Sequence, residues 1–287
     1  MKTSTQTASL SGKVGAEKAI EFIAKAGFDA WDFSLFSMCG YDWGKNCIIE
    51  TDHPLAGKDY LAFSRKLRKI GEDNGIYCNQ SHAPFPTYCK EIEGYFKRAI
   101  ECTAEAGGRI CVIHPDHYRT TQENAQMYLE LLPFAKDCGV KIATENMWGW
   151  EKGEPHCFAS ACGTPESFCA HLDAVNDDFL VACLDIGHAE MVGSETTAVE
   201  LINALGSRLR ALHIHDNDKL HDSHQIPFSM SIDFDAIVKA LKKIDYKGEF
   251  TLEADSYLSA YTEENAFEGI KNLADSARKL ANMFETL

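Results

Sequence analysis

The sequence has little of what would place it in a membrane or on nucleic acid. No apolar run in its 287 residues approaches the ~20 residues that a membrane-spanning helix needs. Positive charge is scarce, because 28 Lys and Arg are outnumbered by 43 Asp and Glu, and the formal net charge is −15. Such a surface repels polyanions unless its cations cluster, and no basic amphipathic segment stands out. These absences argue against a nucleic-acid partner and predict no membrane partner.

Low-complexity tracts, linkers and a disulfide framework are missing as well. The first ten residues, MKTSTQTASL, contain no apolar stretch of the kind found in secretory signals. The eleven cysteines are odd in number and scattered, several of them within apolar runs such as RICVIHP (109–115) and LVACLDIG (180–187). A free Cys in such a run behaves as a small core hydrophobe. We therefore expect reduced thiols and a cytoplasmic location.

What the sequence does contain is a repeated unit, in which an amphipathic helix ends near a Gly and a short apolar strand follows. A Gly just past a helix adopts the left-handed conformation that closes it at low cost. One weak strand is predicted within residues 2–9. The other seven predicted strands are FDAWDFS (28–34), IYCNQSHAP (76–84), RICVIHP (109–115), VKIATEN (140–146), FLVACLDIG (179–187), LRALHIHD (209–216) and EFTLEAD (249–255).

These eight strands, each followed by a helical pattern, predict an α/β fold. Near-continuous apolar runs such as 179–187 are typical of parallel strands buried on both faces. Eight βα units usually close into a barrel, so we predict a single (β/α)8 TIM barrel that occupies residues 1–287 as one domain. An open, doubly wound sheet is the alternative, but no Gly-rich phosphate loop follows an early strand.

Acidic residues and histidines stand at the ends of seven predicted strands. These residues are Asp32, His82, His114, Glu145, Asp185 with His188, His213 with His215 and Asp216, and Glu253 with Asp255. In a barrel the strand ends share one face. A lone Asp such as Asp32 could equally cap a helix, but crowded carboxylates are costly to bury unless they are paired or metal-bound. No Lys or Arg stands at these ends, so we predict a divalent metal ion, with the mixed N and O ligands that suit Zn, Mn or Co.

Seven short motifs in this order resemble the xylose-isomerase-like TIM-barrel superfamily. The motifs are SHAPF (81–85), VIHP (112–115), ATEN (143–146), CLDIGH (183–188), LHIHDND (212–218), DSHQIP (222–227) and LEAD (252–255). Two branches of that superfamily are the sugar (phosphate) isomerases/epimerases and the endonuclease-IV-type nucleases of AP endonuclease family 2. The resemblance is strongest over residues 76–256, and it implies the same barrel.

The ketose 3-epimerase branch implies a site with one metal ion. Its four ligands come from strands five to eight and correspond here to Glu145, Asp185, His213 and Glu253. The same resemblance implies substrate contacts for Glu151 and His188. Further candidates for substrate contacts are His82, His114, His224 and Trp148. The Arg that contacts substrate in this branch has no clear match, although Lys219 lies near its position.

The nuclease branch implies a larger site with three zinc ions. Its additional ligands correspond to His82, His114, His188, Asp222 and His224, and this sequence has the matching residue type at all five positions. With both branches in view, we predict one catalytic ion, and a multinuclear site with up to three ions stays open.

We predict a metal-dependent sugar or sugar phosphate isomerase/epimerase with a small carbohydrate as its partner. In this reading Glu145 and Glu253 exchange protons with the substrate around a metal-stabilised enediolate.

The long segments 34–54, 146–163 and 216–232 would cover the pocket. A nuclease needs a cationic track, yet the first two of these segments hold only Lys45 and Lys152. An inosose-dehydratase-like lyase and a homo-oligomer remain open alternatives.

Overall fold

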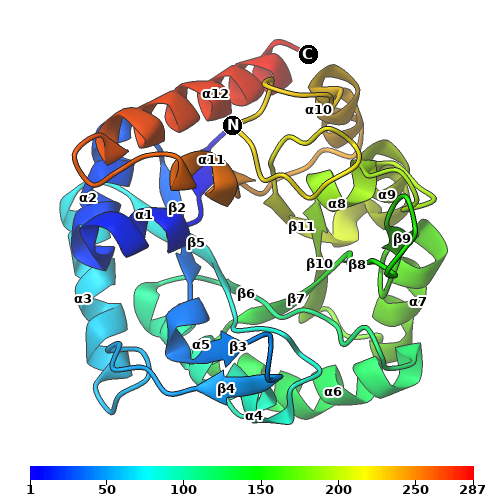
Figure 1. Ribbon diagram of the computed structural model, residues 1–287, viewed down its shortest axis with the longest axis horizontal. Helices are drawn as coiled ribbons and strands as arrows, with labels where there is room; N and C mark the ends of the chain where they lie inside the picture. The colour runs from blue at the N-terminus through cyan, green and yellow to red at the C-terminus, as the bar shows by residue number, and fades with distance from the viewer.

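Eight parallel strands form a closed ring at the centre of the computed structural model, which describes residues 1–287 (Figure 1). In chain order they are β1 (Thr3–Thr5), β2 (Ala30–Ser34), β5 (Tyr77–His82), β6 (Ile110–Val112), β7 (Lys141–Glu145), β10 (Leu180–Asp185), β11 (Leu209–His213) and β12 (Phe250–Leu252). Strands β2, β5, β6, β7, β10 and β11 form one continuous sheet. β12 pairs with β1, and the single bridges Gln6–Asp32 and Ile214–Leu252 join this pair to β2 and β11. The predicted TIM barrel is confirmed.

A layer of helices surrounds the ring, and at least one helix follows every barrel strand (Figure 1). The helices are α1 (Ala8–Val14), α2 (Ala16–Ala26), α3 (Tyr60–Asp73), α4 (Lys90–Glu93), α5 (Phe96–Ala106), α6 (Thr121–Cys138), α7 (Pro165–Val175), α8 (Ile186–Glu190), α9 (Ala198–Leu205), α10 (Phe234–Lys243), α11 (Asp255–Ser259) and α12 (Ala266–Thr286). Two single 3-10 turns, Phe36–Met38 and Gly206–Arg208, complete the helical elements.

Local capping explains where the helices begin and end. Thr120 and Glu123 form a capping box at the start of α6, and Gly139 closes the helix with φ of 69°. The pattern before Gly139 predicts a helix over residues 121–138, and the structure confirms these bounds. The sequence pattern predicts a further helix from Glu195 to Leu205. A second capping box, between Thr197 and Glu200, starts α9 at Ala198 instead.

The structure differs from the sequence-based expectation mainly at the chain termini and in the long loops. Only three residues of the expected strand 2–9 are extended, because α1 already begins at Ala8. The sequence pattern predicts a last helix from about Thr262, but the helix begins at Ala266. The backbone N–H of Thr262 donates to the side chain of Asn265 in the turn that precedes the helix. Two antiparallel hairpins, β3–β4 (Gly40–Asp42 with Cys47–Ile49) and β8–β9 (Trp148–Gly149 with Phe158–Ala159), were not predicted.

The barrel interior has a small apolar core of its own, separate from the large core between sheet and helices. It consists of Val112, Ala143, Val181, Cys183 and Ala211. Side chains on one side of a strand recur every second residue. Two residues beyond Ala143, Cys183 and Ala211 come Glu145, Asp185 and His213, and this alternation points those three side chains into the barrel mouth directly above the apolar core.

Eight of the eleven cysteines are buried, and none is bonded to another. Cys111 and Cys183 lie inside apolar strands, as the sequence predicted. No helix in the structure has both the length and the apolar character needed to cross a bilayer.

Candidate metal centre

The four residues predicted as metal ligands converge at the carboxyl ends of β7, β10, β11 and β12. Glu145, Asp185, His213 and Glu253 each offer one donor atom, and these four atoms lie within 4.8 Å of one another. The Nδ1 atom of His213 lies 2.9 Å from Oε1 of Glu145 and 3.3 Å from Oε2 of Glu253. No more than 5% of any of the four residues is exposed. We call these residues the central set.

Both glutamates of the central set are ionised at neutral pH. Burial raises the pKa of the Glu145 carboxyl, but the charge of His213 and hydrogen bonds from His114 and His213 outweigh burial and hold that pKa well below its usual range. Burial also raises the pKa of the Glu253 carboxyl. The charge of His213 and a hydrogen bond from His82 outweigh this effect, so the pKa lies below its usual range. Two carboxylates that keep their charge while buried suit a cation site.

Asp32 lies behind His213, on the side away from the two glutamates. Its Oδ2 atom is 3.4 Å from Nε2 of His213 and accepts a hydrogen bond from the amide of Gln80 at 3.1 Å. Asp32 is fully buried. A ligating His commonly donates its other ring N–H to a carboxylate, which fixes the tautomer and the ring orientation. Asp32, whose role the sequence left undecided, is therefore placed to orient His213.

Replacing Asp32 by Asn should weaken metal binding by about 10- to 100-fold, because the amide orients His213 less firmly and does not raise its basicity. Titration of the metal-free protein with Zn²⁺ against a competing chelator measures this change. Asp29→Asn is the control. Asp29 is partly buried and directly precedes β2, three residues before Asp32, and this variant should bind the metal as the wild type does. Equal affinity in Asp32→Asn and wild type would contradict the orienting role.

A second set of donors adjoins the central set. Nε2 of His114 lies 3.2 Å from Oε2 of Glu145, and Nε2 of His82 lies 2.7 Å from Nε2 of His114. Nδ1 of His82 is also 3.4 Å from Oε1 of Glu253. The two oxygens of Glu145 thus serve different neighbours, Oε1 in the central set and Oε2 in this histidine pair. Glu145 could therefore contribute one oxygen to each of the two sets.

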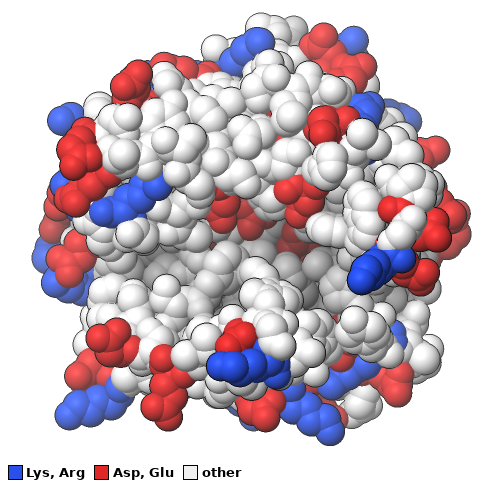
Figure 2. All heavy atoms as spheres, viewed as in Figure 1, with Lys and Arg blue, Asp and Glu red and all other residues white.

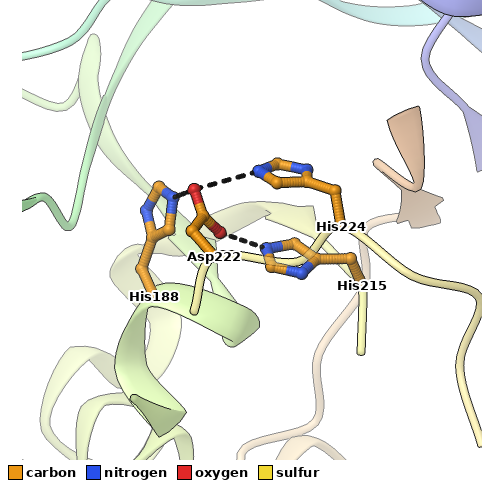
Figure 3. Close-up of side chains that lie close together, drawn as sticks. All are labelled: His188, His215, Asp222 and His224. Atoms are coloured by element: carbon orange, nitrogen blue, oxygen red, sulfur yellow. Dashed lines mark hydrogen bonds and ion pairs between the residues drawn. The ribbon is translucent and has the colours of Figure 1, made fainter. Parts of the chain in front are cut away.

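A third set consists of three imidazoles around one carboxylate (Figure 3). Oδ2 of Asp222 is 3.4 Å from Nε2 of His188 and 3.2 Å from Nε2 of His224. Its Oδ1 is 3.4 Å from Nε2 of His215. His188 comes from α8, His215 from the end of β11, and the other two from the loop after β11. All four donor atoms lie within 4.8 Å of one another, and three N ligands with one O ligand suit Zn²⁺.

His215 is the one member of the third set that was not chosen from the sequence as a ligand. It is completely buried, and its Nε2 lies 3.2 Å from Oδ1 of Asp185 as well as 3.4 Å from Asp222. The alternation of strand residues that brings His213 inward also brings His215 inward, and this was the signal in the sequence. Gly187 leaves room for the ring, since a Cβ there would lie 1.9 Å from Cε1 of His215.

Replacing His215 by Gln should lower the affinity of the third set for Zn²⁺ by at least about tenfold, because one of its four donors is lost. Metal analysis after dialysis against dilute chelator should then find fewer ions per chain than in wild type. His221→Gln is the matched control, since His221 is exposed in the same loop and pairs only with Asp218. The same metal content in His215→Gln and His221→Gln would rule His215 out as a ligand.

Two further polar residues hold the ligands in place. The side chain of Asn146 donates to the carbonyl of Asp185 at 2.8 Å and accepts from its N–H at 2.8 Å, while the Asn146 carbonyl lies 2.9 Å from Nδ1 of His188. The amide of Gln6, just past β1, donates to Oε1 of Glu253. Neither residue was predicted. Asn146 belongs to the ATEN motif, and Gln6 lies at the end of the weakest strand.

Unpartnered polar atoms gather at this site. Eight buried side-chain polar atoms in the structure lack a well-formed hydrogen bond, and seven belong to residues described above. They are Gln6 Oε1, Asp32 Oδ1, Glu145 Oε2, Asp185 Oδ2, His213 Nε2, His215 Nε2 and Asp222 Oδ1. Each such atom costs roughly 1–3 kcal/mol when left without a partner. The central set contains three of them and the third set two, and one of the three, Glu145 Oε2, faces the histidine pair. The residues present therefore fit divalent cations.

A cavity of about 450 Å³ opens above the three sets. Of the central set, only Glu145 and Glu253 line it, whereas Asp185 and His213 lie beneath. The long segments that were expected to cover the pocket do so through residues such as Trp43, Met147 and Asp222. No Lys or Arg lines the cavity. Figure 2 shows acidic side chains within the central hollow of this face, with Lys and Arg toward the periphery.

The cavity wall is strongly aromatic. Phe36, Trp43, Phe85, Tyr88 and Trp148 all line it. The Phe36 ring packs edge-on against Phe85 with centroids 4.8 Å apart, and the Trp148 ring lies 6.3 Å from that of His188. Such rings present flat apolar surfaces to whatever enters.

The remaining predicted contacts are divided between the cavity and the surface. His82, His114, His188, His224 and Trp148 line the cavity. Glu151 does not: it is exposed in the loop between β8 and β9. Lys219 lies 3.4 Å from Glu190 and is likewise absent from the cavity lining. The structure therefore brings Glu151 and Lys219 to the outer loops and not to the metal centre.

Comparison with known proteins agrees with this architecture. An uncharacterized protein of Methanocaldococcus jannaschii, MJ1311, is 26% identical over 254 residues, which cover 82% of this chain and 78% of that protein. A D-tagatose 3-epimerase-like protein of known structure superimposes with a TM-score of 0.70 at 22% identity, covering 98% of this chain and 99% of the other. An L-ribulose 3-epimerase gives 0.70 at 18% identity, with coverage of 99% and 95%. These two solved structures share the fold of the present chain.

The match to a family model extends over nearly the whole barrel. Residues 20–283 match the model described as xylose isomerase-like TIM barrel. That range includes the ends of seven barrel strands and every residue of the three donor sets. The chain belongs to the xylose isomerase-like TIM barrel family.

Proposed function

We propose that this protein is a divalent-metal-dependent isomerase or epimerase of carbohydrates, and that its substrate is an unphosphorylated sugar. One observation carries the proposal: two buried, ionised carboxylates, Glu145 and Glu253, reach the same cavity, and no Lys or Arg lines it. The solved structures with the same fold include sugar 3-epimerases, which supports the same class of reaction.

The central set would hold the catalytic ion. When bound, a divalent ion supplies a Lewis acid that polarises a carbonyl oxygen and a neighbouring hydroxyl of the substrate. The histidine pair His82 and His114 and the third set would hold one further ion each, so we propose a site for up to three ions. The buried polar atoms without partners in the central and third sets, together with Glu145 Oε2 beside His114, support that number.

Glu145 and Glu253 would move the proton. Each carries its charge at neutral pH, so either can act as a general base toward a C–H bond next to a carbonyl. They belong to β7 and to the end of β12, and they therefore approach the cavity floor from different sides of the barrel mouth. One takes the proton from the substrate carbon and the other returns a proton to the opposite face or to the next carbon. Hydrogen bonds from His213 and Gln6 fix their orientation.

The lining of the cavity favours a neutral sugar over a sugar phosphate. A phosphate group is usually bound by Arg, Lys or a helix N-terminus, and no such cation faces this cavity. The aromatic wall formed by Phe36, Phe85 and Trp148 can pack against the C–H faces of a sugar. His114 is kept neutral, because burial lowers its pKa, and it can therefore exchange hydrogen bonds with a hydroxyl without adding charge.

Hydrolysis of DNA at abasic sites is a second candidate, and the three donor sets favour it. Several metal ions in one site can stabilise both oxygens in a phosphodiester cleavage. The surface around the cavity does not favour it. DNA binding draws on Lys and Arg contacts to phosphates, and the hollow in Figure 2 is acidic.

A substrate panel in D₂O tests the proposal. The metal-loaded protein is incubated with free ketoses, with their phosphate esters and with a duplex that contains an abasic site. We expect deuterium at the carbon next to the carbonyl, together with an epimer or isomer, from one or more free ketoses and from none of the esters. Chelator should abolish the exchange. Net loss of water would point instead to an inosose-dehydratase-like lyase, and cleavage of the duplex would overturn the assignment.

A further inference from the structure

A second cavity lies at the opposite end of the barrel from the metal centre. Its volume is about 760 Å³, compared with about 450 Å³ above the metal ligands. It is lined by residues at or just before the amino-terminal ends of barrel strands, including Lys2 before β1, Tyr77 in β5, Lys141 in β7 and Glu249 before β12. The loops that close α5 and α6 complete its rim at Gly107 and Gly139. None of its lining residues belongs to the three donor sets.

The charge of this cavity is opposite to that of the chain. Acidic residues outnumber basic ones by 43 to 28 in the whole sequence, but the cavity lining holds six basic residues and two acidic ones. The basic residues are Lys2, Arg68, Arg109, Lys141, Arg210 and Lys247, and the acidic ones are Glu72 and Glu249. A concave surface lined by one sign of charge focuses the electrostatic field and attracts counter-ions.

The two acidic residues are already engaged. Oε1 of Glu72 accepts a hydrogen bond from Arg68 at 2.7 Å, and Oε1 of Glu249 accepts one from the hydroxyl of Tyr77 at 2.5 Å. Arg109 and Arg210, by contrast, form no side-chain hydrogen bond, ion pair or cation–π contact anywhere in the structure. Arg210 belongs to β11 itself and is exposed although its strand neighbours are buried. Two guanidinium groups are therefore free to bind a ligand.

The carboxyl-terminal ends of α5 and α6 on this rim explain why some of the basic residues lie there, but not all of them. The carbonyl ends of α5 and α6 carry partial negative charge, which favours a nearby cation. Lys141 also donates to the carbonyl of Asp178 and lies 4.7 Å from the Phe179 ring centre, so its position has a structural explanation. Arg68 pairs with Glu72 and Lys247 with Asp245, but no comparable contact explains Arg109 or Arg210. Two guanidinium groups without a counter-ion among further cations oppose folding.

We propose that this cavity binds a small phosphorylated molecule. A guanidinium group binds a phosphate through two parallel hydrogen bonds, and Arg109 and Arg210 supply two such groups. The volume lies within the range of small-molecule sites, about 300–1,000 Å³. Tyr77 and Phe179 also line the cavity, and a lysine lies over each ring. This proposal is independent of the function proposed above, because it concerns the other end of the barrel.

Isothermal titration calorimetry tests the proposal with two probes, inorganic phosphate and adenosine 5′-monophosphate, on the full metal-loaded protein at physiological ionic strength. The test variant is R109Q/R210Q. K58Q/K271Q is the control, since it removes the same charge outside the cavity, at the exposed Lys58 and the partly exposed Lys271. E145Q, altered at the metal centre, separates binding here from binding to the metal ions.

We expect wild type, K58Q/K271Q and E145Q to bind one equivalent of the nucleotide with the same affinity, and R109Q/R210Q to bind at least about tenfold more weakly. Phosphate that binds as tightly as the nucleotide would identify the free anion as the ligand. Two results would overturn the proposal: no binding of either probe at millimolar concentration, or equal binding by R109Q/R210Q and wild type. A thermal melt of R109Q/R210Q without ligand establishes that the variant is folded.

Discussion

Replacing Glu145 by Gln is expected to lower kcat by about 10²- to 10⁴-fold, the range that a positioned acid or base contributes. Glu145 has two roles that the amide cannot fill together. Its Oε1 is 2.9 Å from His213 in the central set, and its Oε2 is 3.2 Å from His114 in the adjoining pair. The amide has no negative charge and only one acceptor atom. Metal content should therefore fall as well, and steady-state kinetics together with metal analysis of the same preparation measure both losses.

The control for this change is Glu154→Gln. Glu154 is exposed in the loop between β8 and β9, and the substitution removes the same charge without touching the cavity. We expect wild-type kcat and metal content from it. Glu145→Gln with full metal content and full activity would mean that the central set is not the catalytic site.

The barrel was predictable because its signals are local and repeated. Each of the eight strands lies within a segment that was predicted from apolar residues bounded by turns. Helix ends were marked by a Gly that adopts the left-handed conformation, as Gly139 does after α6. Hairpins β3–β4 and β8–β9 carry no comparable pattern, since they are short, half exposed and stabilised within their own loops. The expected first strand was too long, because the sequence gives no sign that α1 begins as early as Ala8.

The grouping of the predicted ligands followed from the sequence for a related reason: these residues stand at strand ends, where the fold itself brings them together. The structure gathers the four residues of the central set and the five additional candidates at one mouth of the barrel. Residues that act through a neighbour were harder to find. Asp32, Gln6 and Asn146 matter because of which atom they contact, and that depends on the barrel being closed.

Glu151 illustrates the limit of carrying a role over by spacing alone. Its position six residues after Glu145 implied a substrate contact, but the structure places it on the surface of the β8–β9 loop. Along a strand every residue adds a fixed rise, so the number of residues between two positions predicts their distance in space. In a loop the conformation can differ between relatives, so the same number of residues does not predict the same position. Its predicted contact with the substrate would require that loop to move toward the cavity.

Glu253→Gln provides the sharpest test of the two-carboxylate mechanism, because it should separate proton removal from proton return. If Glu145 and Glu253 serve opposite faces of the substrate carbon, the variant keeps one base. It can then remove a proton from one epimer and return deuterium to the same face, without completing the reaction. We expect epimerisation to fall by about 10²- to 10⁴-fold in both directions, while deuterium still enters one epimer from D₂O at a measurable rate.

The two epimers serve as each other's control in this experiment, since both are tested on one preparation whose metal content is known. The amide oxygen of Gln can still bind an ion and still accept the hydrogen bond that Gln6 donates to Oε1 of Glu253. Loss of the ion alone would stop exchange from both epimers equally. Exchange that is lost equally from both epimers while the ion is retained would therefore assign both proton transfers to Glu253, and Glu145 would then be a metal ligand only.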